Sequence, residues 1–73
     1  NERGSEMRLQ DLRHGDHWAA TDGTARTYHS SCLKAATKRG YCMVVRFWKG
    51  NRFHAMTLKL GNYLKKEVDV WTA

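Results

Sequence analysis

The 73-residue sequence contains no proline and only two cysteines. Two cysteines are too few for the disulfide framework on which small secreted domains depend, so we expect a cytoplasmic protein that folds without crosslinks. No apolar run approaches the ~18 residues that a membrane span needs, and no signal peptide is recognisable, so no membrane association is expected. A chain of this length builds one domain with a thin core, which favours a small binding protein without a cofactor over an enzyme.

Acidic side chains are missing from the middle of the chain. Residues 23–66 hold ten lysines and arginines and no aspartate or glutamate, while both flanking segments have a negative balance and the whole chain has a formal charge of +6. Such a block of like charges repels itself, and a bound polyanion relieves the repulsion and releases counterions. The charge pattern favours nucleic acid as the partner; the alternative is a basic surface that serves solubility only.

The residue pattern predicts an α+β fold, in which one main helix over about residues 25–38 packs on a small antiparallel sheet. Thr24 is a good N-cap for that helix, and Gly40 suits the left-handed position that ends one. Tyr28 and Cys32 lie four residues apart, with two alanines one turn further on, and would form the buried face of the helix.

Residues 41–60 carry the strongest strand signal, because β-branched and aromatic residues stand on both sides of Gly50-Asn51. Glycine in the first position of a two-residue loop is typical of a type II′ hairpin turn. This turn would pair residue 48 with 53, 46 with 55, 44 with 57 and 42 with 59. One face of the hairpin would then form the core under the helix. Its predicted members are Tyr41, Met43, Val45, Phe47, Met56, Leu58 and Leu60.

Shorter elements are predicted towards both ends. The segments near 17–21 and 67–72 are typical of strands that extend the sheet, and residues 63–66 of a short helical turn. Residues 1–6 are polar and aperiodic, so we expect a flexible tail followed by a single domain over residues 7–73.

Two predicted surfaces carry the positive charge. Polar and basic residues at every fourth position would line the exposed side of the helix, within reach of a DNA groove or its phosphates. Trp48 and Phe53 would pair across the hairpin as a stacking platform for bases. The candidate nucleic-acid-binding residues are Arg26, Ser30, Lys34, Lys38, Arg39, Arg46, Trp48, Lys49, Arg52, Phe53 and Lys59. The alternatives are a helix face that is only solvated, and two rings covered by Trp18 or by the C-terminal segment.

Metal binding and catalysis have weaker signals. His14 and His17 lie three residues apart, but no further ligands follow at zinc spacing, so no metal site is predicted. A disulfide between Cys32 and Cys42 is not expected, because Cys32 would face the core and Cys42 the opposite side of the sheet. His54 beside cations is the arrangement closest to a metal-independent ribonuclease, yet we assign no catalytic residue.

The stretch from Ser31 to Leu60, SCLKAATKRGYCMVVRFWKGNRFHAMTLKL, resembles the helix-plus-hairpin segment of small basic DNA-binding proteins encoded by phages and plasmids. In those proteins an alanine-rich helix ends in a Lys/Arg-Arg-Gly step and leads into a strand rich in valine and arginine. The resemblance covers less than half of the chain and implies a mobile-element origin and DNA binding. The order of helix and hairpin also resembles the end of a winged helix, but residues 7–22 are too short for the two helices that would precede it.

The leading hypothesis is a non-enzymatic regulatory protein that binds DNA in preference to RNA and acts as a monomer or homodimer in the host cytoplasm. The first alternative is a protein-interaction module whose paired rings and surrounding arginines inhibit an acidic host enzyme. The second is a metal-independent ribonuclease toxin with His54 as its acid or base.

Overall fold

The computed structural model describes residues 6–36, 38 and 40–71. Six strands form one antiparallel sheet in the order β1-β6-β2-β3-β4-β5, and only one short helix occurs among these residues. The protein is therefore largely β. The elements are β1 (Glu6–Arg8), the 3₁₀ turn η1 (Leu9–Asp11), β2 (His17–Ala19), β3 (Ala25–Ala36), β4 (Gly40–Lys49), β5 (Arg52–Lys59), α1 (Leu60–Lys65) and β6 (Glu67–Trp71).

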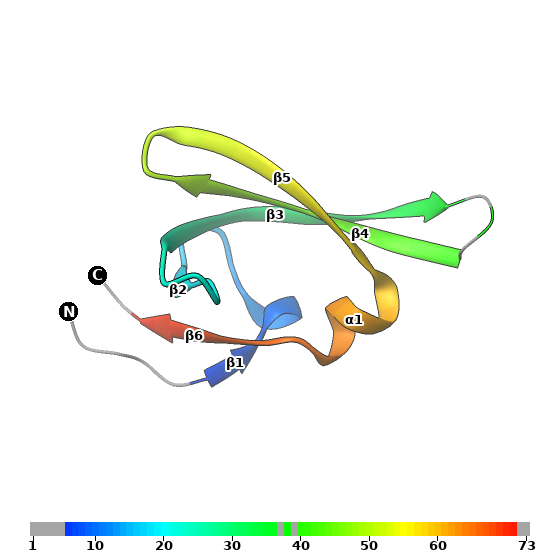
Figure 1. Ribbon diagram of the computed structural model, residues 1–73, viewed down its shortest axis with the longest axis horizontal. Helices are drawn as coiled ribbons and strands as arrows, with labels where there is room; N and C mark the ends of the chain where they lie inside the picture. Colours follow the sequence, from blue (N-terminus) through cyan, green and yellow to red (C-terminus); the bar gives the residue numbers. More distant parts are fainter. Residues whose placement is uncertain (1–5, 37, 39, 72–73) are drawn as a thin grey trace.

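The sheet folds over, so that its two halves face each other (Figure 1). β3, β4 and β5 form one half, β1, β6 and β2 form the other, and α1 links β5 to β6 at one end. The core lies between the halves, where the ring of Trp18 is 6.3 Å from that of Tyr28 and 5.6 Å from that of Phe47. Its buried side chains are Leu9, Leu12, Trp18, Tyr28, Val45, Phe47, Tyr63 and Val68.

The main helix predicted over residues 25–38 is wrong, because residues 25–36 form β3 and pair with β4. A side-chain repeat of four residues stays on one side of a helix and of a regular strand alike, so the spacing alone could not distinguish them. Threonine, tyrosine, histidine, serine and cysteine are also poor helix formers, and pairing with a strong neighbouring strand outweighs the weak preference that remains. Thr24 is not a helix cap but donates from its backbone N and its Oγ1 to Asp22 Oδ1 in the turn before β3.

The predicted hairpin over residues 41–60 is confirmed in position and register. β4 pairs with β5 as expected, from Trp48 opposite Phe53 to Cys42 opposite Lys59. Gly50 has φ +64°, as the first position of a type II′ turn requires. The predicted core face points inward except at Tyr41, which is 56% exposed. Tyr41 is the second residue of β4, and the start of β4 projects with the end of β3 past α1, where no second layer covers them (Figure 1).

An irregularity in β3 decides which of its side chains face the core. Tyr28 pairs with Phe47 and Ser30 with Arg46, so His29 is an extra residue between two regular pairs. Such a β-bulge shifts the alternation of a strand by one position. Even-numbered residues of β3 therefore face the core before the bulge and face outward beyond it.

The shorter predicted elements are present. The strands expected near 17–21 and 67–72 are β2 and β6, and the helical turn expected at 63–66 is part of α1. Glu6, predicted in the flexible tail, instead begins β1 and pairs with Asp69. Residues 1–5 and Thr72 lie outside the described residues. No helix in the described part of the chain is long and apolar enough to cross a membrane.

Candidate nucleic-acid interface

Five strands, β2, β3, β4, β5 and β6, share a surface that points away from the core, and we call this surface the outer face. One row of directly paired residues crosses five strands on this face, and paired residues of adjacent strands share a side of the sheet. The row consists of Trp71 on β6, His17 on β2, Thr27 on β3, Trp48 on β4 and Phe53 on β5. Trp48 and Phe53 remain 40% and 47% exposed, so two large rings at the end of this row are open to solvent.

The rings of the row contact one another and two neighbouring histidines. The centroids of Trp48 and Phe53 are 4.7 Å apart, and His29 lies edge-on to Phe53 at 5.1 Å. His14 lies 5.1 Å from His29 and its Nδ1 donates to the His29 carbonyl oxygen at 3.1 Å. These contacts hold the rings in place, because each adds packing energy beyond simple burial.

Near the other end of the row, His17 contacts two neighbours, Thr27 and Trp71. Its Nδ1 lies 2.9 Å from Thr27 Oγ1, and its ring stacks at 6.3 Å on that of Trp71. The row is therefore an ordered aromatic surface rather than two isolated side chains. We call Trp48, Phe53, His29 and His14 the aromatic cluster.

Cations continue the outer face away from the aromatic cluster. Arg46 lies one row further along, and its Nη1 donates to Cys32 Sγ at 3.2 Å. Lys34 and Lys59 lie on either side of Cys42 in the last row. The side chains between these rows are short. They are Ser30, Cys32, Val44, Ala55 and Thr57. The surface between rings and lysines is therefore low enough for a flat ligand to approach the sheet.

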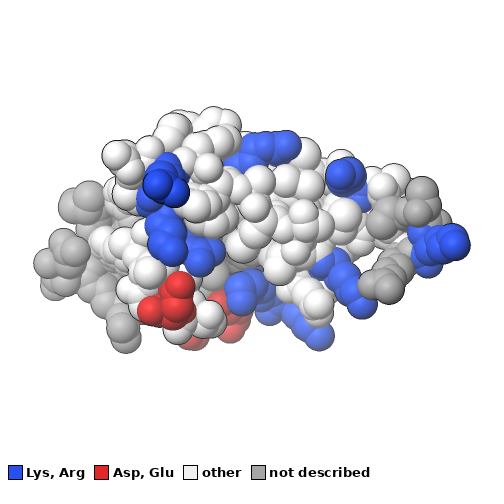
Figure 2. All heavy atoms as spheres, turned by 45° about the horizontal axis from the view of Figure 1, so that its top comes forward, with Lys and Arg blue, Asp and Glu red and all other residues white. Residues whose placement is uncertain are grey.

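The acidic side chains belong to one half of the molecule only. The segments that form β3, β4, β5 and α1 contain no acidic residue, and the carboxylates belong to residues before 23 and after 66. Figure 2 shows lysines and arginines spread over the viewed side and acidic atoms only at its lower margin. Ion pairs formed between described residues are Arg8–Asp11 and Arg26–Asp22, neither of which involves a cation of the outer face.

The structure separates residues that were predicted to act together. Arg26, assigned to an exposed helical stripe, points to the inner side of the sheet with only 18% of its side chain exposed. Ser30 and Lys34 do lie on the outer face, because the bulge reverses the alternation after Tyr28. Lys38 lies in the turn between β3 and β4, and Arg39 is outside the described residues.

The hairpin part of the predicted site is brought together. Lys49 and Arg52 flank the turn beside Trp48 and Phe53. The alternative in which Trp18 covers the two rings is wrong, because Trp18 is buried in the core on the other side of the sheet. The C-terminal strand does not cover them either, since Trp71 lies in the same row and three strands away from Trp48.

Several residues of the outer face were not predicted. His17 and Trp71 join the aromatic surface through the pairing of β2 with β3 and β6, and Thr27 joins it through its pairing with Trp48 on β4. His14 and His29 join it through ring contacts with each other and with Phe53. No turn links β2 to β6, so the sequence holds no local signal for that register. The bulge at His29 likewise depends on long-range pairing. Only the turn between Trp48 and Phe53 allowed part of the site to be predicted from the sequence.

Cys32 has different surroundings from those expected, whereas Cys42 lies on the outer face and His54 lies opposite Phe47, as predicted. Cys32 is exposed on the outer face rather than buried, because residue 32 lies beyond the bulge, and both Cys32 and Cys42 are free thiols. His54 points inward, stacks on Phe47 at 5.5 Å and has a buried Nε2 without a hydrogen-bond partner in the described part of the protein. No cluster of three or more metal-ligating side chains occurs among the described residues.

Comparisons of the chain with models of protein families, with curated proteins and with solved structures find no match. A function is therefore inferred from two properties of the molecule, the exposed rings of the outer face and the separation of its charges.

Proposed function

We propose that the protein binds single-stranded nucleic acid on its outer face. Bases stack on the exposed rings of Trp48 and Phe53, and the backbone phosphates run towards Arg46 and the lysines beyond it. The observation that carries the proposal is that two adjacent rings, 40% and 47% exposed, lie on the part of the outer face formed by β3, β4 and β5, whose charged side chains are all basic. Exposed rings beside a cationic track are the arrangement by which sheets hold single strands without reading their sequence.

A single strand fits this face better than a duplex. The bases of a duplex are already stacked and paired, so their faces are not available to Trp48 and Phe53. The major groove is about 12 Å wide and admits a two-stranded ribbon. The outer face presents three adjacent strands and their side chains, which together exceed that width at about 4.8 Å between strands. The DNA-binding hypothesis from the sequence is thereby narrowed to unpaired strands.

The proposal is tested by fluorescence anisotropy with labelled oligonucleotides of about 12 nucleotides, a length within the usual site size. Single-stranded DNA, single-stranded RNA and duplex DNA are compared with the intact protein and with W48A and F53A. Because a base stacked on a ring contributes about 1–3 kcal/mol, each substitution should weaken single-strand binding by about 5- to 150-fold. L64A is the matched control, since Leu64 is an exposed apolar residue on α1, outside the outer face.

Three outcomes would overturn the proposal. One is an unchanged affinity in both W48A and F53A, and another is a duplex that binds as tightly as either single strand. The third is no binding of any oligonucleotide at about 50 mM salt, where phosphate contacts are strong. In that case the rings and Arg46 would have to serve a protein partner, whose anchors have the same composition.

A further inference from the structure

The inner side of the folded sheet contains a cleft of about 340 Å³, at the lower end of the size range of small-molecule sites. It opens between β5 on one side and β1, β6 and the end of β2 on the other. In the described part of the chain, β5 pairs only with β4 and β1 only with β6, so the cleft lies between the two free edges of the sheet. Its lining residues are Glu6, Trp18, Ala19, Ala20, Thr21, Arg26, Met56, Leu58, Lys66, Glu67, Val68 and Asp69.

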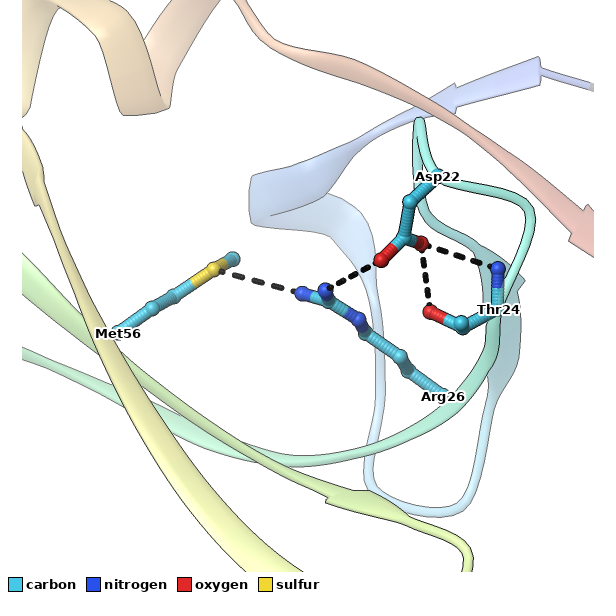
Figure 3. Close-up of polar contacts among 4 residues, drawn as sticks. All are labelled: Asp22, Thr24, Arg26 and Met56. Carbon is cyan, nitrogen blue, oxygen red and sulfur yellow. Dashed lines mark hydrogen bonds and ion pairs between the residues drawn. The ribbon is translucent and has the colours of Figure 1, made fainter.

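Arg26 is the charged residue that β3 contributes to the lining of this cleft, and Figure 3 shows its polar contacts. Its guanidinium carbon lies 4.6 Å from the centre of the Phe47 ring, and its Nε is buried without a hydrogen-bond partner among the described residues. Nη1 contacts the thioether of Met56 at 3.8 Å, and a thioether is a weak acceptor. Most of the side chain is therefore shielded from water, yet its hydrogen-bonding capacity is largely unused.

Asp22 only partly neutralises Arg26. The shortest distance between the two charged groups, from Nη2 to Asp22 Oδ2, is 4.0 Å. The other carboxylate oxygen accepts hydrogen bonds from Thr24 N at 3.0 Å and Thr24 Oγ1 at 2.7 Å. Figure 3 shows Asp22 drawn towards the turn by Thr24 while Arg26 extends below it towards Met56. An arginine that is mostly buried and weakly paired is destabilising unless something else supplies an anion.

We propose that this cleft binds a small apolar molecule carrying a single carboxylate. The carboxylate accepts hydrogen bonds from the terminal nitrogens of Arg26, whose planar fork matches the two oxygens of that group. The apolar body lies against Trp18, Met56 and Leu58. The ligand thereby provides the anion that Asp22 supplies poorly, in a site where little water competes.

The opposite wall of the cleft limits the charge of the ligand. Glu6, Glu67 and Asp69 are among the residues that line it, and Lys66 is the cation beside them. A second negative charge on the ligand would be repelled by this excess of acidic residues around the cleft. Dicarboxylates and nucleotides should therefore bind worse than monocarboxylates. The cleft is thus distinct in chemistry from the outer face, which attracts phosphates.

The test uses nuclear magnetic resonance of the full chain, labelled at methionine methyl groups and tryptophan indoles. Trans-cinnamate is the probe, cinnamamide is its neutral counterpart of the same shape, and phenylsuccinate adds a second carboxylate. Cinnamate should shift the Met56 methyl and the Trp18 indole, and both other compounds should bind at least about tenfold more weakly. The Trp48 indole, on the opposite side of the sheet, should not respond.

Two variants identify the carboxylate partner. R26M keeps an apolar stem of similar length and should lose about tenfold or more in cinnamate affinity, whereas R13M, an exposed arginine outside the lining, should not change it. D22N removes the competing charge and should tighten binding by about two- to fivefold, the range of a surface ion pair. Equal binding of cinnamate and cinnamamide, or an unchanged affinity in R26M, would overturn the proposal. If R26M does not fold, weaker or unchanged binding in D22N does so instead.

Discussion

The basic side chains at the two ends of β3 point to opposite sides of the sheet. Arg26, before the bulge, points inward over the Phe47 ring with 18% of its side chain exposed. Lys34, beyond the bulge, is exposed on the outer face. A single extra residue at position 29 thus places neighbouring cations of one strand on opposite sides of the same sheet. The comparison shows that the surface charge of this protein is set by strand register as much as by composition.

The same difference separates the energetics of the two groups. Outward cations repel one another through water, so their interaction is weak and salt screens it. Arg26 has lost most of its hydration and instead contacts a thioether, an aromatic ring and a carboxylate 4.0 Å away. These contacts compensate poorly for its burial. Salt and polyanions should therefore weaken the repulsion among the outer cations. Replacing Arg26 by an apolar residue, or binding an anion beside it, should raise the free energy of unfolding.

The largest effect is expected from an insertion that shifts the register of β3 beyond the bulge. Deleting His29 would leave Tyr28 opposite Phe47 and Ser30 opposite Arg46, whereas inserting an alanine between Ser31 and Cys32 would move one half of β3 by one residue and turn each of its side chains to the opposite face. Either Tyr28 or the inward residues beyond the bulge would leave the core, and we expect the cooperative fold to be lost. Thermal unfolding followed by circular dichroism measures this.

His29→Ala is the control for that insertion. It keeps the residue count and removes only the ring contacts with His14 and Phe53, so it should cost less than about 1.5 kcal/mol. An insertion variant that melts as cooperatively as His29→Ala would show that pairing with β4 does not fix the register of β3.

The next effect concerns the cations beyond the bulge and on the neighbouring strands. Replacing Lys34, Arg46 and Lys59 together by glutamine should reduce the slope of log K against log salt for a single-stranded oligonucleotide by about 2, at about 0.7 per phosphate contact. Anisotropy titrations between about 50 and 200 mM salt measure the slope. Lys65→Gln on α1 should leave it unchanged. An equal slope in the triple variant would mean that phosphates do not contact this face.

A smaller effect is expected at Arg26. Arg26→Met replaces a weakly paired cation by an apolar side chain and should raise the free energy of unfolding by about 1 kcal/mol, after the loss of the ring contact is subtracted. Arg46→Met, on the water-facing side, should stay within about 0.5 kcal/mol of the parent protein. Urea titration compares the two. A loss of stability in Arg26→Met would mean that the guanidinium holds the two halves of the sheet together.

Features of this molecule that depend on neighbouring residues could be predicted from the sequence, and features that depend on contacts between distant segments could not. The hairpin and its register follow from Gly50-Asn51 and the residues beside it, so half of the aromatic cluster was predicted. The strand β3 was not predicted, because it forms through its pairing with β4 rather than through its own propensities. The rest of the aromatic row and the cleft required the contact of β6 with β2, which no turn encodes.

The smallest effect lies at Asp22, the charge that Arg26 only partly meets. Its pKa is lowered from the ordinary 3.8, first by the hydrogen bonds from Thr24 and further by the charge of Arg26. A depressed pKa in the folded state stabilises the fold above the ordinary pKa, and the contribution is lost as the pH falls through the folded value. Asp22→Asn keeps an oxygen for Thr24 but has no charge to lose. Urea unfolding between about pH 6 and pH 2.5 should therefore show the small advantage of the parent over Asp22→Asn shrinking on acidification. An advantage that grows instead would mean that Asp22 is held protonated in the fold, and that Arg26 is even less well neutralised than its distance indicates.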